Sequence, residues 1–170
     1  NYFTMAGKLD EPAHTYLYLG KSNKLADILL DNRKIEISGS KPTYDSVKVI
    51  GSDIDMQWKE WFQDDQRIGY QKYRLDKLYK SLMDKKDLEN ANSDNSLCEE
   101  LSIDRINLLK NYVRRYNDSP SGAVLPTLCT IQTSLTKSDY LEMYNSLTPR
   151  MRSSTFGKEI LDLAEKTKTK

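Results

Sequence analysis

The sequence has little histidine, cysteine and glycine, and it has no long apolar run. His14 is the only histidine, so a serine triad would need that imidazole as its base, and no G-x-S-x-G turn presents a nucleophile. No segment approaches the roughly 18 consecutive apolar residues that a membrane span requires. The acidic stretch 87–96 lacks the glycine and the terminal glutamate of a calcium loop. The sequence therefore predicts no catalytic residue, no metal site and no cofactor.

An excess of charge of one sign is also missing. The chain has 26 Lys and Arg against 25 Asp and Glu, so its formal net charge is +1. A nucleic-acid binder needs a basic face that displaces counterions from phosphates, so we predict no nucleic-acid partner. The 170 residues fit one domain with a real core. The chain starts at Asn1 instead of Met, which predicts that the natural N-terminus and any signal peptide have been removed.

The two cysteines leave two interpretations open. Cys98 and Cys129 are far apart and form no C-x-x-C pair, so local spacing builds neither a zinc knuckle nor a dithiol redox site. They are either two buried thiols that act as small apolar residues or the halves of a structural disulfide. A disulfide, which could also act as a redox switch, requires Cα atoms within roughly 7 Å of each other.

Residues 1–52 predict a small antiparallel β-sheet, an incomplete sandwich. Short runs rich in β-branched and aromatic residues predict strands at 2–6, 14–19, 25–30, 34–38 and 46–50. Asp31-Asn32-Arg33 is typical of a tight hairpin turn, because Asn and Asp tolerate left-handed backbone geometry. An unpaired edge of such a sheet invites pairing with another chain, so we predict a possible dimer through this edge.

Residues 53–170 predict a mainly helical portion, packed with the sheet as one α+β domain. Apolar residues at spacings of three and four predict one long helix from Ser52, with Gly69 as a point of possible interruption and the polar stretch 87–96 as a loop that ends it. Start signals and apolar stripes then predict helices at 101–116, 119–134, 136–147 and 148–164. Pro126 predicts a kink in the second of these or a later start.

The stretch Gly51-Ser52 connects the last predicted strand to the first helix. Free backbone N–H groups at such a helix start can bind a phosphate. Here Asp53 and Asp55 already occupy the positive end of the helix dipole, and they would repel an anion. We therefore predict that Ser52 and Asp55 form a capping box and that the stretch is a structural joint.

Two pairs of aromatic residues are candidates for a binding surface. Trp58 and Trp61 share a face of the first helix, and Tyr16 and Tyr18 share a face of a strand. Exposed rings of this kind could stack on sugar rings or on a peptide. Alternatively, the two tryptophans seal the junction between helix and sheet. Burial of the two indole rings would favour the second interpretation.

The order of several segments resembles a known domain. These segments are YFTMAGKLDEP at 2–12, LADILLDNRKIEISG at 25–39, SVKVIGS at 46–52, NDSPSG at 117–122 and STFGKEILDLAEKTK at 154–168. Together they are similar to the N-terminal domain of unknown function that precedes the thioredoxin domain in envelope thiol-disulfide oxidoreductases of Bacteroides-type bacteria, proteins similar to TlpA and ResA. The resemblance covers nearly the whole chain.

The resemblance implies a location and a role, but no catalytic residue. In that family additional strands precede the segment that matches Phe3 to Pro12, and the resemblance implies that a thioredoxin domain with its C-x-x-C would begin shortly after Lys170; neither is in this sequence. Cys98 and Cys129 match no redox motif of the family. The implied chain is a non-catalytic accessory domain, exported to the periplasm or outer envelope, with a membrane link only through a lipid anchor outside it. Its partner would be the C-terminal thioredoxin-like domain or a client protein; the alternative is a stand-alone glycan- or peptide-binding module.

Overall fold

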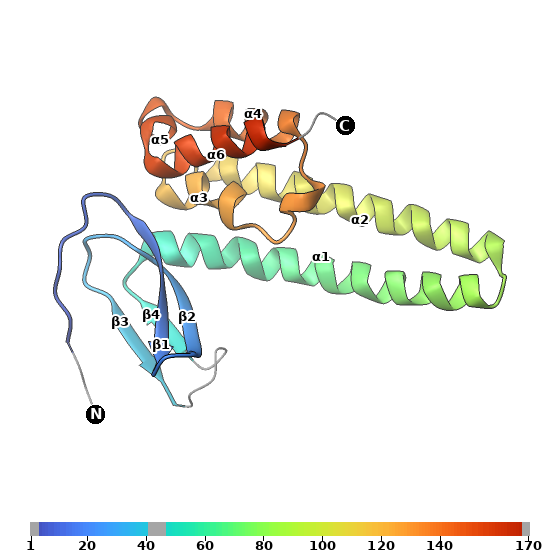
Figure 1. The fold of residues 1–170 in the computed structure, drawn as a ribbon, viewed down its shortest axis with the longest axis horizontal. Helices are drawn as coiled ribbons and strands as arrows, with labels where there is room; N and C mark the ends of the chain where they lie inside the picture. The colour runs from blue at the N-terminus through green and yellow to red at the C-terminus, as the bar shows by residue number, and fades with distance from the viewer. Residues whose placement is uncertain (1–3, 41–46, 168–170) are drawn as a thin grey trace.

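A computed structural model describes residues 4–40 and 47–167 of the chain. It confirms the α+β class: two small antiparallel sheets precede a series of helices. Figure 1 shows the sheets at one end of a long pair of antiparallel helices, with the shorter helices covering part of that pair. In the described part of the chain, no helix is long and apolar enough to cross a membrane.

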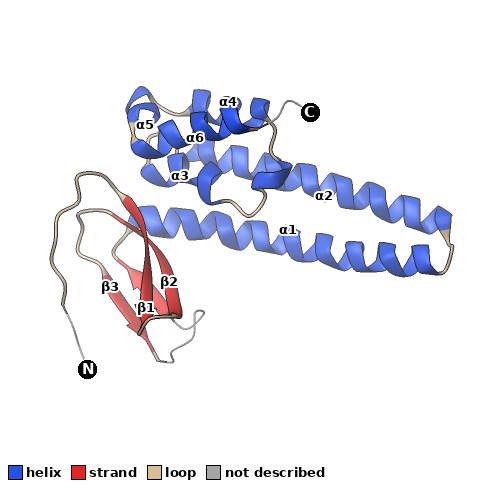
Figure 2. Ribbon diagram, viewed as in Figure 1, coloured by secondary structure: helices blue, strands red, loops and turns tan. Residues whose placement is uncertain are grey.

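The strands form two two-stranded sheets instead of the single sheet that the sequence predicts (Figure 2). The pairs are β1 (Ala13–Leu19) with β2 (Asn23–Leu30), and β3 (Glu36–Gly39) with β4 (Val47–Ile50). In β2 four consecutive residues, 26–29, are buried, so this strand carries most of the contact between sheet and helices.

The turn prediction at Asp31–Arg33 is wrong. The hairpin between β1 and β2 turns at residues 20–22, where Gly20 adopts a positive φ of 69°. The side chain of Asn32 instead accepts a hydrogen bond from the backbone N–H of Leu9 and donates one to its carbonyl, both at 2.8 Å. This segment therefore fastens the chain ahead of β1. In the predicted strand 2–6, residues 4–6 lie outside any strand, and residues 1–3 lie outside the described part.

Two long helices form a hairpin: α1 (Asp53–Asp84) and α2 (Leu88–Arg115). Helix α1 runs without interruption through Gly69, where the guanidinium of Arg105 lies against the helix. A Cβ at position 69 would lie 3.4 Å from the Cζ atom of Arg105. The glycine thus makes room for a neighbouring side chain, and it does not end the helix.

The polar stretch 87–96 is not a loop, because it forms the start of α2. Asp87 is the N-cap, and its carboxylate accepts a hydrogen bond from the N–H of Asn90. Ala91, Asp94 and Cys98 are buried at spacings of three and four residues, which is the helical period. The buried face of the helix consists here of small and polar side chains. The apolar periodicity that predicts a helix is therefore absent from this stretch.

The remaining helices are shorter than predicted. They are α3 (Pro120–Leu128), the 3-10 turn η2 (Gln132–Ser134), α4 (Lys137–Ser146), α5 (Pro149–Ser153) and α6 (Thr155–Lys166). Helix α3 ends two residues after Pro126, which has no N–H to donate within a helix. The predicted capping box of Thr136 and Asp139 is confirmed at the start of α4. Ser154 divides the last predicted helix into α5 and α6.

One hydrophobic core joins the sheet to the helices. It includes Leu29 of β2, the first three turns of α1, the last two turns of α2, and buried residues of all the later helices. Within the described chain, no fully buried member of this core comes from residues 62–108. The distal half of the α1–α2 hairpin therefore extends beyond the core, and Figure 1 shows it projecting past the shorter helices.

Candidate functional site

The chain passes from β4 into α1 at Gly51. This glycine has a φ of +98°, and a Cβ there would collide with the carbonyl oxygen of Lys34. Only glycine satisfies both conditions without strain. The backbone at this point lies too close to its neighbour to leave space for a bound phosphate on that side.

Ser52 and Asp55 fasten the start of α1 to β2. The Ser52 hydroxyl accepts the Asp55 N–H at 3.2 Å, which confirms the predicted N-cap, and it donates to the Leu29 carbonyl at 2.9 Å. The Asp55 carboxylate accepts the Leu29 N–H at 2.9 Å and pairs with Lys59 at 2.6 Å. The predicted capping box is therefore wrong in its second half, because Asp55 turns to the strand. The stretch is a joint.

Both tryptophans are buried, which confirms that they seal the helix–sheet junction. Trp58 is 7% exposed and Trp61 is fully buried. The ring of His14 meets Trp58 edge-on at 5.5 Å, and its Nε2 atom lies 3.1 Å from the carboxylate of Asp27. Trp58 and Trp61 cannot stack on a ligand from solution, so they are removed from the candidate binding aromatics.

Tyr16 and Tyr18 are exposed, at 47% and 48%. Their ring centroids are 6.2 Å apart, and the ring planes meet at 62°. The Nζ atom of Lys24 lies 4.3 Å from the centre of the Tyr16 ring. The two rings therefore form no flat platform, although each presents an edge or a face to solvent.

The disulfide interpretation is wrong, and the buried-thiol interpretation is confirmed. Both cysteines are free and buried. Cys98 lies beside Asp76 of α1, whereas Cys129 lies beside Asp65 of the same helix. These two aspartates are eleven positions apart, or about 16 Å along a helix at 1.5 Å per residue. The thiols are held too far apart to be joined.

The buried thiol of Cys129 makes the stability of the fold sensitive to alkali. Burial raises the pKa of this thiol from 9.0 to about 12. Between pH 9 and 12 the unfolded chain loses the proton that the folded chain keeps, so this contribution to stability is complete below pH 9 and declines as the pH rises. We expect the urea midpoint of Cys129→Ala to fall less steeply over this range than that of the parent chain. Equal slopes for the two proteins would contradict the prediction.

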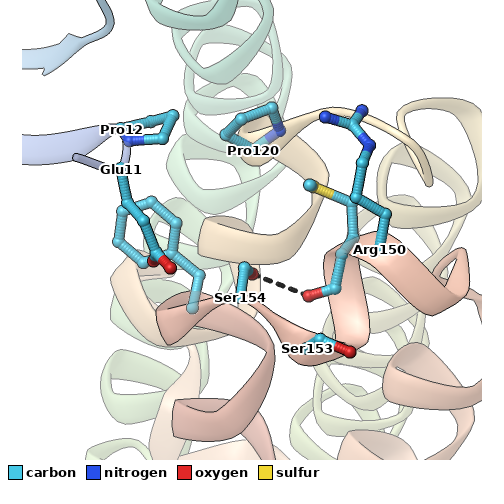
Figure 3. A pocket seen from close by; sticks show the side chains of 8 residues that line it. Glu11, Pro12, Pro120, Arg150, Ser153 and Ser154 are labelled. Carbon is cyan, nitrogen blue, oxygen red and sulfur yellow. Dashed lines mark hydrogen bonds between the residues drawn. The ribbon is translucent and has the colours of Figure 1, made fainter. Parts of the chain in front are cut away.

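A pocket of about 320 Å³ lies where the segment ahead of β1 meets α3, α5 and α6 (Figure 3). The Glu11 carboxylate accepts the Thr155 N–H at 3.1 Å, and its hydrogen bonds with the Thr155 side chain and backbone lower the pKa of Glu11. Arg150 donates to both the carboxylate and the backbone carbonyl of Asp118. The Ser154 hydroxyl donates to the Met151 carbonyl, the dashed line in Figure 3. The polar side chains that line the pocket are thus already hydrogen-bonded within the chain, so we assign the pocket a structural role.

A charged network joins the proximal halves of α1 and α2. The Asp65 carboxylate, 1% exposed, accepts bonds from Arg105 Nε at 2.7 Å and Nη2 at 2.6 Å, and from the Thr130 hydroxyl at 2.8 Å. One turn earlier, Glu60 accepts a bond from the Tyr116 hydroxyl at 2.7 Å, which lowers the pKa of Glu60. The buried carboxylate of Asp65 is fully paired, so this region is held firmly.

The distal half of the hairpin presents a second hollow on the surface of the described chain. A groove of about 590 Å³ runs between the two helices. Its lining residues are Gln71, Arg74, Leu75 and Leu78 of α1 and Leu97, Glu100, Leu101 and Asp104 of α2. Leu78 and Leu97 are 49% and 46% exposed. We call this surface, defined by these eight residues, the hairpin groove.

The charges of the hairpin groove are unpaired. The side chains of Arg74, Glu100 and Asp104 are exposed and take part in no hydrogen bond or ion pair with the described residues. The cation lies on the α1 wall and both anions lie on the α2 wall. The hairpin groove thus has an apolar floor between unpaired charges of opposite sign.

The sequence contains a signal for this groove that composition alone does not show. Both walls follow the spacing i, i+3, i+4, i+7, which places their members on one face of each helix. The interpretation of 87–96 as a loop hid the second wall, because it removed the evidence that α2 runs beside α1 to the tip. Comparisons with known protein families, with curated proteins and with solved structures find no match for this chain.

Proposed function

We propose that this chain is a non-catalytic interaction domain and that the hairpin groove is its binding surface. The observation that carries the proposal is the exposure of Leu78 and Leu97 between unpaired charges, on a hairpin that no other described element covers at this point. Exposed apolar side chains that share one face of two helices favour a protein partner, because their burial on binding is favourable.

The cellular context of the proposal comes from the resemblance of the sequence. We propose that the domain is exported, serves an envelope thioredoxin-like thiol-disulfide oxidoreductase, and helps to position its thioredoxin-like domain or its client. The state of the two thiols supports a role without redox catalysis. Burial raises the pKa of both Cys98 and Cys129, and a reactive cysteine needs the opposite shift, toward the thiolate.

An insulin-reduction assay driven by a small dithiol tests the absence of catalysis. We expect the rate with the 170-residue chain to equal the rate without protein. Cys98→Ser and Cys129→Ala should leave that rate unchanged, because neither thiol is exposed or activated. A thioredoxin-type protein serves as the positive control. A rate above the background that Cys98→Ser abolishes would contradict the proposal.

A second candidate function uses the exposed pair Tyr16 and Tyr18. Rings of this kind can stack on a sugar or on the side chains of a peptide, and the exposure of both favours this alternative. Substitutions on each surface distinguish the two candidate functions. A glycan or peptide ligand of the strand face is lost with Tyr16→Ala and kept with Leu78→Asp, whereas a partner of the hairpin groove shows the reverse.

A further inference from the structure

We infer that the occupant of the hairpin groove is the hairpin groove of a second copy of this chain, so that two hairpins form a four-helix bundle. The inference rests on the proposed function, since it names the partner of the same surface. Two packed helices bury only part of the apolar stripe of each helix. A second pair of helices can cover the part that remains exposed.

The apolar floor of the groove is self-complementary. Leu75 and Leu78 lie on one wall, and Leu97 and Leu101 lie on the other, so each wall contributes two leucines. Leu75 and Leu101 are half-buried already, whereas Leu78 and Leu97 are the more exposed pair. A two-fold axis brings the same patch of both copies together, and a patch with equal apolar halves fits that symmetry.

The charges select the orientation of the second copy. Cys98 of α2 lies beside Asp76 of α1, so on these antiparallel helices Arg74 is level with the turn that holds Leu97 and Glu100. A two-fold axis parallel to the helices places α1 of one copy against α2 of the other at the same level. Arg74 of each copy then faces Glu100 of the other copy, with Asp104 one turn away.

The other face-to-face arrangement is unfavourable. A two-fold axis across the helices places α1 against α1 and α2 against α2. The acidic residues Glu100 and Asp104 of the two copies then lie on facing walls, and like charges that meet in an interface oppose association. The two hairpins therefore point in the same direction, and both pairs of sheets lie at the same end of the dimer.

Sedimentation velocity and light scattering of the 170-residue chain, from low to high micromolar concentration, test the inference. We expect a reversible dimer. Arg74→Glu should weaken it by at least about tenfold, because the change acts at both ends of the symmetric interface. The exchange Arg74→Glu with Glu100→Arg should recover most of the loss. Leu78→Asp should leave a monomer.

Matched controls separate the groove from the rest of the surface. Lys80→Glu makes the same change of charge as Arg74→Glu, but on the opposite face of α1, and it should leave the dimer intact. Circular dichroism and the unfolding midpoint of each variant establish that the chain is folded. A chain that stays monomeric at every concentration overturns the inference. So does a dimer that is insensitive to Arg74→Glu and Leu78→Asp, which would indicate association through a sheet edge.

The two proposals fail in different experiments. Catalysis in the insulin assay overturns the non-catalytic role, but it leaves the hairpin groove as the binding surface on which the dimer rests. A monomeric chain whose Leu78→Asp variant loses binding to a thioredoxin-like domain removes the dimer and leaves the proposed function in place.

Discussion

Asp65→Ala is expected to destabilise the chain by about 3–5 kcal/mol, because it leaves the guanidinium of Arg105 without its buried counter-ion. The carboxylate of Asp65 is 1% exposed and receives two hydrogen bonds from Arg105 and one from Thr130. These bonds connect α1, α2 and the loop after α3, so their loss affects three elements together. Urea unfolding followed by circular dichroism measures the change.

Two controls make the effect of Asp65 specific. Asp64→Ala removes the neighbouring carboxylate, which is 30% exposed and accepts the Tyr112 hydroxyl, and it should cost about 1 kcal/mol. The double change Asp65→Leu with Arg105→Met removes both charges and should recover most of the stability. If the double variant is as unstable as Asp65→Ala, packing at this position outweighs the ion pair and the explanation is wrong.

Trp61→Ala is expected to cost about 3–5 kcal/mol of unfolding free energy, because it opens a large cavity in the core. Trp61 is fully buried and belongs to the cluster that includes Leu29 of the sheet and the later helices. The loss should therefore loosen the sheet and the helices together, in a single unfolding transition. Differential scanning calorimetry and urea unfolding both report it.

Trp61→Phe is the matched control for this prediction. The indole N–H of Trp61 is buried and has no hydrogen-bond partner among the described residues, so the change to Phe removes volume without breaking a hydrogen bond. We expect a loss well below that of Trp61→Ala. A loss below about 1 kcal/mol for Trp61→Ala itself would mean that the core closes over the site, against the usual behaviour of close-packed interiors.

The fold class and most helix starts followed from the sequence because their signals are local. Ser52 and Thr136 mark helix starts through capping hydrogen bonds, and Ser119-Pro120 marks one through a proline at the first helical position. The structure has helices at all three. The pairing of the strands could not be predicted from the sequence, because a run of β-branched residues does not indicate which other strand it pairs with. Asn32 illustrates this: its turn chemistry was visible, but its bonds reach Leu9, 23 residues away.

The candidate site was harder to predict than the fold. The sequence suggested aromatic residues as binding groups, and burial of Trp58 and Trp61 removed half of them. The exposure of a side chain depends on how the whole chain packs. The apolar stripe of a helix does not indicate whether another element covers it. The hairpin groove exists because the shorter helices cover only the proximal half of α1 and α2, which no local pattern indicates.

The length of α1 sets a distance between the two ends of the domain. Its 32 residues span about 48 Å at 1.5 Å per residue. The joint of Ser52 and Asp55 fixes one end of this helix to β2, whereas the groove around Arg74 lies about 33 Å further along it. The helix pair therefore acts as a rigid spacer. A molecule bound in the groove would therefore be kept at a constant distance from the strands.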